Sequence, residues 1–282
     1  MMLLLIIFLF PAINVSPVIG VVQGTPALPA GEYCATHPQT GVKYSGQAPS
    51  RHYYTDHLEN VYFIDGYKLL KIDTATGEVM EFGSYSAGEI TLADVSNPFQ
   101  IMVLYRDFNR IVFLDNKLSR LRSEIDLSEL GIEQAVLACT SGRGGMWIFS
   151  DRDNRIIYFD QQLRNTHQSM VIGSIAGPAG KPVSMTEAQN RLYLYIPRKG
   201  ILVFDRFASY ITTVPYSGPE RFRVTGNNII YFDGGKLISM DMESGEEIYL
   251  DLPSGVEIDD AMMHSAYLFL LSGNRFMLYG RH

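Results

Sequence analysis

The hydrophobic positions of this chain fall in short paired runs. Each pair consists of an apolar stretch of four or five residues, a polar turn and a second apolar stretch. Val, Ile, Phe and Tyr dominate these stretches, and such residues favour the pleated, half-buried surface of a β-sheet. The connections contain Asp-Gly, Asn-Arg, Gly-Gly and Gly-Asn, which tolerate the backbone angles of tight turns. The pattern therefore predicts six β-hairpins, at 61–73, 101–115, 146–160, 192–205, 229–241 and 267–280.

The hairpins are copies of one repeat, because the same residue type ends nearly every one. Five of them close on an aspartate, and the sixth has Gly280 there. The aspartates are Asp73, Asp115, Asp160, Asp205 and Asp241. An aspartate at this place can accept hydrogen bonds from backbone N–H groups and fix the next turn.

Further short apolar runs flank the hairpins. The upstream runs are 90–95, 134–140, 182–188, 221–226 and 259–264, and the downstream runs are 77–82, 122–127, 209–215 and 245–252. Four short antiparallel strands in each ~40 residues is the spacing of a propeller blade. The fold class predicted is all-β, a single β-propeller of about six blades. A sandwich or barrel is the rival, but neither requires a hairpin repeated six times in register.

The last repeat lacks an outer strand, because the chain stops at His282. An unpaired sheet edge invites aggregation. A strand from the N-terminal region, at 41–45, is therefore expected to pair there and close the ring. The domain organisation predicted is an export segment at 1–24, an N-terminal segment at 25–51 and the propeller at 52–282.

The first residues resemble an export signal. Residues 1–22 carry no charge, and the apolar core Leu3–Phe10 is too short to cross a bilayer of ~30 Å. Small residues follow, which predicts cleavage after Gly24. We expect an exported protein, periplasmic or associated with the outer membrane of a Gram-negative bacterium, with no stable membrane span after cleavage. A retained N-terminal anchor is the alternative.

The net charge and the absence of known motifs limit the classes of function that the sequence supports. The net charge is −7 and the pI about 5.4, which argues against nucleic acid, since phosphate binding requires a basic face. The sequence contains no GxSxG, HExxH or CxxC motif. The loop at 177–182 lacks the hydroxyl residue of a phosphate loop, and 151–154 lacks the later residues of a calcium loop. We assign no catalytic residue, no cofactor and no metal ligand from motifs.

One enzymatic alternative comes from the innermost strands. Six-bladed propellers can hold calcium on their axis and hydrolyse lactones or esters there. A calcium-dependent hydrolase or lyase of this kind would use polar side chains of the inner strands at the central channel. The candidates are Asp94, Glu187, Asp259 and His264, with Asp260 next to Asp259.

Candidate contacts for a protein partner lie in two turns. Phe108 is predicted at the tip of a hairpin between Arg106 and Arg110, where an apolar ring can anchor a partner. The same ring could instead fold back over the neighbouring blade. Arg143 and Trp147, beside the glycines of 141–145, form the second candidate pair.

The repeated I-Y-F-D…L-x-x-[FIM]-D pattern at 52–280 resembles that of exported bacterial propellers with quinoprotein-like repeats. It is also similar to propellers that help assemble outer-membrane proteins. A quinone cofactor is not supported, because quinoprotein enzymes carry tryptophan-docking motifs in most blades and Trp147 is the single tryptophan. The resemblance implies a non-catalytic protein-interaction platform in the cell envelope, within an outer-membrane assembly or secretion machine. Its expected partner is an envelope or outer-membrane protein.

Overall fold

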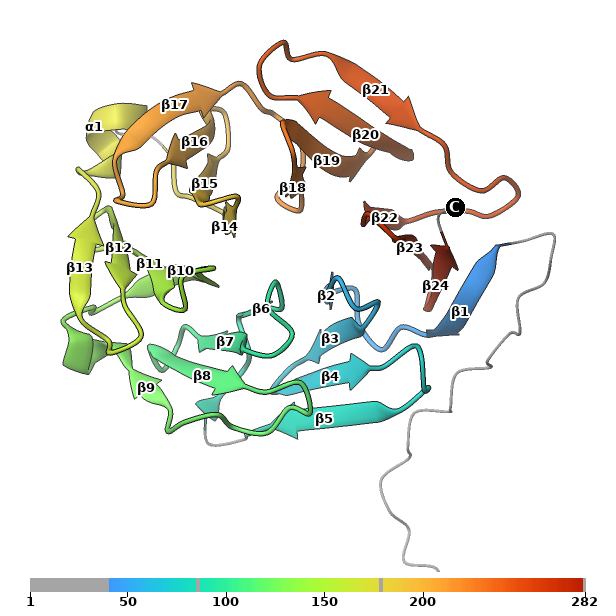
Figure 1. The fold of residues 1–282 in the computed structure, drawn as a ribbon, viewed down its shortest axis with the longest axis horizontal. Coiled ribbons are helices and arrows are strands. Elements are labelled where there is room, and N and C mark those ends of the chain that lie inside the picture. Colours follow the sequence, from blue (N-terminus) through green and yellow to red (C-terminus); the bar gives the residue numbers. More distant parts are fainter. Residues whose placement is uncertain (1–40, 85–86, 178–179, 281–282) are drawn as a thin grey trace, which may run out of the picture.

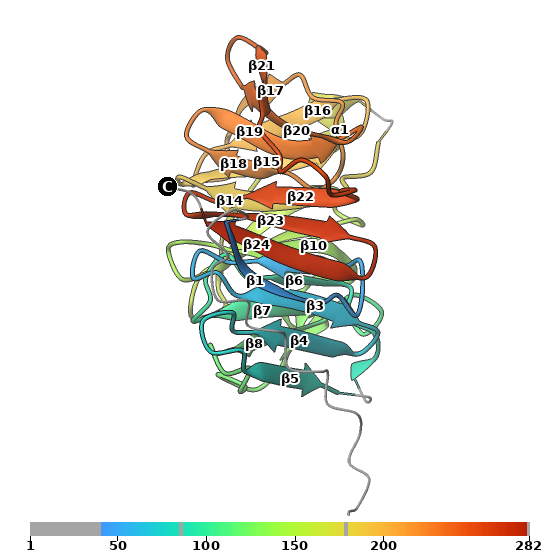
Figure 2. The same cartoon turned by 90° about the vertical axis from the view of Figure 1, so that its right-hand side faces the viewer.

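The chain forms a ring of six blades around a central axis (Figure 1). This structure, a computed structural model, describes residues 41–84, 87–177 and 180–280. The described residues make six sheets, each of four antiparallel strands, and Figure 2 shows the ring from its edge. The predicted six-bladed propeller is confirmed, and the expected export segment 1–24 lies outside the described residues.

The first three blades follow in chain order, each starting at the channel. Blade 1 contains β2 (Tyr53–Thr55), β3 (Val61–Asp65), β4 (Lys68–Ile72) and β5 (Val79–Gly83). Blade 2 contains β6 (Leu92–Asp94), β7 (Ile101–Tyr105), β8 (Arg110–Leu114) and β9 (Ile125–Asp126). Blade 3 contains β10 (Ala135–Thr140), β11 (Met146–Ser150), β12 (Arg155–Phe159) and β13 (Asn165–Gln168).

The last three blades complete the ring. Blade 4 contains β14 (Ser184–Ala188), β15 (Arg191–Ile196), β16 (Gly200–Phe204) and β17 (Tyr210–Val214). Blade 5 contains β18 (Arg223–Thr225), β19 (Asn228–Asp233), β20 (Lys236–Asp241) and β21 (Glu247–Leu250). Blade 6 contains β22 (Asp260–Met263), β23 (Tyr267–Ser272), β24 (Arg275–Gly280) and β1 (Val42–Gln47).

The core lies between the blades. The two middle strands of each blade are buried on both faces, which is why they read as nearly continuous apolar runs. Each cluster of buried side chains joins two neighbouring blades, as Tyr62 and Leu69 of blade 1 do with Val103 and Val112 of blade 2. Burial of apolar area between neighbours therefore holds the ring together.

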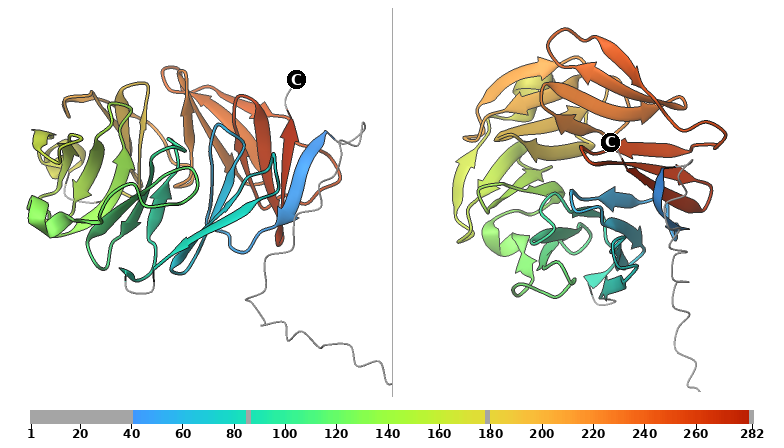
Figure 3. Two further views of the ribbon diagram at one scale, coloured as in Figure 1. Left: turned by 60° about the horizontal axis from the view of Figure 1, so that its bottom comes forward. Right: turned by 45° about the vertical axis from the view of Figure 1, so that its right-hand side comes forward.

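The N-terminal strand closes the ring. β1 pairs antiparallel with β24, so the expected segment 41–45 lies at the edge that the sequence left open. Tyr44 is 1% exposed, and its ring lies 5.7 Å from that of Phe276. Figure 3 shows β1, in blue, beside the red strands of blade 6. Residues from both ends of the chain thus share one sheet.

The closing aspartates fix the turns that follow them, as predicted. One carboxylate oxygen of each accepts hydrogen bonds from two backbone N–H groups. Asp205 is typical, with the N–H groups of Phe207 and Ser209 both at 2.8 Å. A hydrogen bond from Arg164 lowers the pKa of Asp160, and one from the Ser244 N–H lowers the pKa of Asp241.

A few elements were not predicted from the sequence. β2 has only three residues, and β13 (Asn-Thr-His-Gln) has no aliphatic residue because it lies at a solvated edge. Two short helices also lie in the connections, namely the α-helix α1 (Ile172–Ala176) and the 3-10 helix η2 (Leu127–Leu130). Among the described residues no helix is long and apolar enough to cross a membrane.

Candidate functional site

The central channel is lined by the inner strands of the blades. It encloses about 750 Å³, and Asp94 and Glu187 are among the residues that line it. Arg221 and Arg223 of blade 5 also lie there. The channel is therefore polar, and the partners of its carboxylates decide whether they are available for chemistry.

Glu187 joins blade 4 to blade 3. Its Oε1 accepts a hydrogen bond from the Gly142 N–H at 2.9 Å, and its Oε2 accepts one from Trp147 Nε1 at 2.5 Å. Trp147 is 1% exposed, so its side chain lies in the core and not at the surface where the sequence suggested a partner contact. A buried indole N–H requires an acceptor because it has been removed from water, and Glu187 supplies that acceptor.

Asp94 joins blade 2 to blade 3 in the same manner. Its Oδ2 accepts hydrogen bonds from the backbone N–H of Thr140 at 2.6 Å and from its Oγ1 at 2.7 Å. Its Oδ1 accepts a bond from the Ser96 N–H at 2.9 Å. Both oxygens of both channel carboxylates therefore already have donors from the protein.

The remaining channel candidates are also engaged. Asp259 forms an ion pair with Arg51 at 3.1 Å and accepts a bond from the Gly273 N–H. His264 Nε2 lies 2.7 Å from Thr55 Oγ1 and 2.6 Å from Arg223 Nη2. Within residues 41–84, 87–177 and 180–280, no three His, Cys, Asp or Glu side chains gather as a metal site would require. The expected convergence of Asp94, Glu187, Asp259 and His264 is therefore not found.

The position of His264 predicts acid sensitivity. Burial, followed by the charges of Arg223 and His57, lowers its pKa from 6.5 to about 2. Protonation then favours the unfolded chain, so stability falls as pH drops below 6.5 and falls further toward pH 2. We expect a loss of about 2 kcal/mol between pH 7.5 and pH 5 from this group, measured by urea unfolding.

The variant His264→Gln separates this contribution from those of other titrating groups. Its unfolding free energy should depend on pH less steeply than that of the wild type over the same range. Equal slopes in the two proteins would mean that another group causes the acid sensitivity.

The blade 2 turn carries the first candidate contact. A methyl group built on Gly88 would lie 2.5 Å from Cε2 of Phe108, so the ring lies directly against that backbone. Phe108 thus folds back over the connection from blade 1, although half of it stays exposed. Arg110 pairs with Glu124 at 2.6 Å, and Arg106 donates its backbone N–H to Thr91 Oγ1. Of the two readings of Phe108, the structure shows the fold-back contact.

The second candidate, Arg143, belongs to a stack of side chains between blades 3 and 4. Its guanidinium lies 4.2 Å from the ring centre of Tyr158 and donates to the Arg206 carbonyl at 2.7 Å. His167 stacks on Tyr158 at 5.9 Å and meets Phe207 edge-on at 5.4 Å. We call the outer members Arg143, His167, Arg206 and Phe207 the cationic aromatic patch.

The patch is open to partners. Phe207 is 49% exposed, and the guanidinium of Arg206 lies 4.6 Å from its ring centre. Neither Arg143 nor Arg206 forms an ion pair with a described carboxylate. The sequence analysis did not identify Arg206 and Phe207. Phe207 is an aromatic residue in a polar turn, after Asp205, and the same kind of signal identified Phe108.

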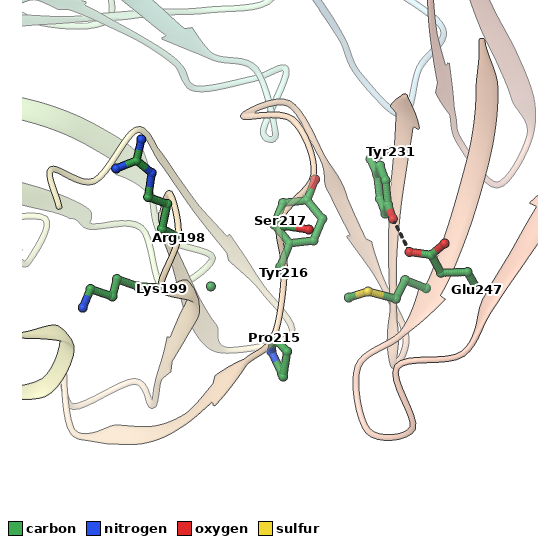
Figure 4. Close-up of a pocket in the computed structure, with 9 residues that line it drawn as sticks. Arg198, Lys199, Pro215, Tyr216, Ser217, Tyr231 and Glu247 are labelled. Carbon is green, nitrogen blue, oxygen red and sulfur yellow. Dashed lines mark hydrogen bonds between the residues drawn. The ribbon is translucent and has the colours of Figure 1, made fainter. Parts of the chain in front are cut away.

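A groove lies between blades 4 and 5 (Figure 4). It encloses about 400 Å³, within the roughly 300–1,000 Å³ of ligand pockets. Tyr216 and Tyr231 meet edge-on at 5.2 Å, and Tyr231 donates to Glu247 Oε1 at 2.7 Å. Arg198 and Lys199 line the opposite side and form no ion pair with a described carboxylate. The groove combines aromatic walls with two cations.

Comparison with known proteins supports the fold only. No protein-family model matches the chain, and no curated protein is significantly similar to it in sequence. A streptogramin B lyase structure is 15% identical over 84% of each chain, with a TM-score of 0.54. The WD40 domain of Pan2 from Neurospora crassa is 11% identical over 82% of this chain and 74% of that one, with a TM-score of 0.51. BamB from Moraxella catarrhalis is 11% identical over 81% and 82%, with a TM-score of 0.48. The similarities to the lyase and to the Pan2 domain show a β-propeller and assign no family.

Proposed function

We propose that this protein is a non-catalytic protein-interaction platform in the cell envelope. The observation that carries the proposal is the cationic aromatic patch, in which exposed Phe207 contacts both His167 and Arg206. Aromatic and arginine side chains dominate the energetic centres of protein interfaces. Arg143 lies in the turn between β10 and β11, and Arg206 and Phe207 lie in the turn between β16 and β17, so the patch is built on connecting turns and a partner can reach Phe207.

Two further observations support this function. The channel carboxylates Asp94 and Glu187 accept hydrogen bonds on both oxygens, so they join blades and are poorly placed to act as bases or metal ligands. The apolar, uncharged first residues of the sequence support export, and we therefore propose a client in the envelope, within an outer-membrane assembly or secretion machine. Fractionation of cells that produce a tagged protein tests the location, and a cytoplasmic fraction would contradict it.

A pull-down from gently solubilised envelopes tests the platform itself. We expect the tagged wild type to recover a stoichiometric envelope protein, with and without chelator, because no bound metal is invoked. The double variant Arg206→Glu with Phe207→Ala should recover at least about tenfold less, as expected for loss of a central aromatic–arginine contact. Quantitative mass spectrometry measures the recovery.

The control is Phe99→Ala, which removes a 59% exposed ring from the β6–β7 connection of blade 2, whereas the patch belongs to blades 3 and 4. Its recovery should equal that of the wild type. If the wild type retains no stoichiometric partner, the platform function is wrong. If both variants lose the partner equally, the patch is not the contact surface.

A further inference from the structure

The outer edges of the six blades differ in how they are protected. Each sheet ends in an outer strand with one free row of backbone N–H and C=O groups, which another chain can extend. Charged residues blunt such edges in natural proteins. Five of the outer strands contain or directly follow a charged residue, namely Lys43 in β1, Glu81 in β5, Asp126 in β9, Arg164 before β13 and Glu247 in β21.

The outer strand of blade 4 is the exception. β17 reads Tyr-Ile-Thr-Thr-Val and lies within the uncharged run 207–219. Its side chains are those that favour extended pairing, and Ile211 is 45% exposed. In Figure 1, β17 lies on the outer circumference of the ring, where no other strand covers it. No described strand pairs with the outer side of β17, and its residues Tyr210, Ile211 and Thr212 are exposed.

Cations stand at both ends of this edge. Arg206, a member of the cationic aromatic patch, precedes the strand. At the other end, Gly200 lies so close to Val214 that a methyl group built on it would be 2.4 Å from the Val214 carbonyl oxygen. Arg198 and Lys199 come directly before Gly200 and line the groove beside that end (Figure 4). The nearest acid in sequence, Asp205, already accepts hydrogen bonds from the N–H groups of Phe207 and Ser209.

We infer that β17 is extended by a β-strand of a partner protein that carries acidic residues at its ends. Main-chain hydrogen bonds to the free edge would give affinity, and the flanking cations would select the charge of the partner. Apolar side chains on one face of the added strand would lie toward the aromatic walls of the groove. This inference rests on the proposed platform function and specifies its mode and the chemistry of its client.

The charges also argue against a second copy of β17 as the occupant. In an antiparallel pair of two copies, the Arg206 end of one strand would lie beside the Arg198 and Lys199 end of the other. Like charges placed opposite each other disfavour such a pair. The acidic strand β21 of another copy, with Glu246, Glu247 and Asp251, has the required chemistry and is therefore tested separately.

Purified full-length protein and synthetic peptides provide the test. The probe is the fluorescein-labelled peptide EDVTVTVDE, measured by fluorescence anisotropy. The charge-reversed form KKVTVTVKK is repelled by the flanking cations, and the proline form EDVTPTVDE lacks a backbone N–H that the strand ladder requires. Both forms should therefore bind at least about tenfold more weakly. Equal affinity for all three peptides, or no binding of EDVTVTVDE, overturns the inference.

A matched pair of variants locates the site. Ile211→Glu places a negative charge on β17 and should weaken binding of EDVTVTVDE about tenfold or more, as a charge does on a paired edge. Ile248→Glu makes the same change on β21, where Ile248 is 60% exposed, and should leave binding within about twofold. If Ile211→Glu does not fold, the double variant Arg198→Glu with Lys199→Glu replaces it. Equal weakening by the changes on β17 and β21 overturns the assignment to β17.

Light scattering after size-exclusion chromatography distinguishes a separate partner from a second copy of this chain. A wild type that remains monomeric supports a separate partner. Self-association that both Ile211→Glu and Ile248→Glu abolish would show that β21 of a second copy occupies the edge, and would overturn the inference. Peptide binding without any envelope partner in the pull-down would leave strand addition standing while the platform function fails. An envelope partner in the pull-down without binding of EDVTVTVDE would overturn strand addition and leave the platform function standing.

Discussion

Replacing Glu187 by alanine is expected to lower the free energy of unfolding by about 3 kcal/mol. The change leaves two donors without their acceptor, the Gly142 N–H and the buried Nε1 of Trp147. A hydrogen bond to a charged group contributes about 1.5–3 kcal/mol, and an unsatisfied buried donor costs a comparable amount. Because these bonds connect blade 4 to blade 3, their loss also weakens the packing between the two blades.

The measurement uses the only tryptophan of the chain. Trp147 is that residue, so its fluorescence during urea unfolding reports directly on the site. The folded Glu187→Ala protein should also show a changed emission maximum, since the indole loses its partner. Glu187→Gln retains an acceptor and should cost less than the alanine variant.

Glu220→Ala is the matched control, because Glu220 is an exposed glutamate that also lines the channel. None of the ion pairs among the described residues involves it, so its effect should stay within about 0.5 kcal/mol. Equal unfolding midpoints for the Glu187→Ala protein and the wild type would mean that the carboxylate is free for another role. The channel would then have to be reconsidered as a reactive site.

The repeat could be predicted from the sequence because its signals are local. The hairpin turns and the closing aspartates act within a few residues, as the bonds of Asp205 to Phe207 and Ser209 show. Ring closure by the segment near Tyr44 followed from a different argument, namely that an unpaired edge must find a strand. Neither prediction required knowledge of how the blades are oriented relative to one another.

The contacts between blades could not be predicted in this way. Glu187 and Trp147 are 40 positions apart, and Asp94 and Thr140 are 46 apart. Which side chains meet there depends on the twist of each sheet and on the distance between neighbouring blades. Acidic residues on inner strands therefore suggested a shared calcium site, whereas the structure shows each carboxylate bonded to the next blade.

The exposed hydrophobic residues could not be recognised from the sequence for another reason. Aromatic and branched side chains on strands are buried by default, so Ile211 and Tyr249 were indistinguishable in sequence from the core. Only the position of β17 and β21 as the last strands of their sheets places these side chains at the surface. The uncharged run 207–219 was visible in the sequence, but its meaning depended on the structure placing it at an edge.

Replacing Tyr44 by alanine is expected to have the largest effect of all, a loss of about 3–5 kcal/mol in the free energy of unfolding. The side chain of Tyr44 is fully buried in the cluster that joins blades 6 and 1, where its ring stacks on Phe276. Its loss leaves a cavity in the one sheet that joins the two ends of the chain. Because β1 is held by a single neighbouring strand, the cavity also weakens its pairing with β24.

Opening of the ring exposes a new edge, so the measurement has two parts. Urea unfolding gives the stability of Tyr44→Ala, and light scattering on mild heating detects aggregation through the bared strand β24. Lys43→Ala is the control, since its ion pair with Glu59 is partly exposed and contributes at most about 1 kcal/mol. If the two variants were equally stable, β1 would not close the propeller. The stability of the disk would then come from contacts between blades alone, and the aggregation-prone edge would have to be protected by other means.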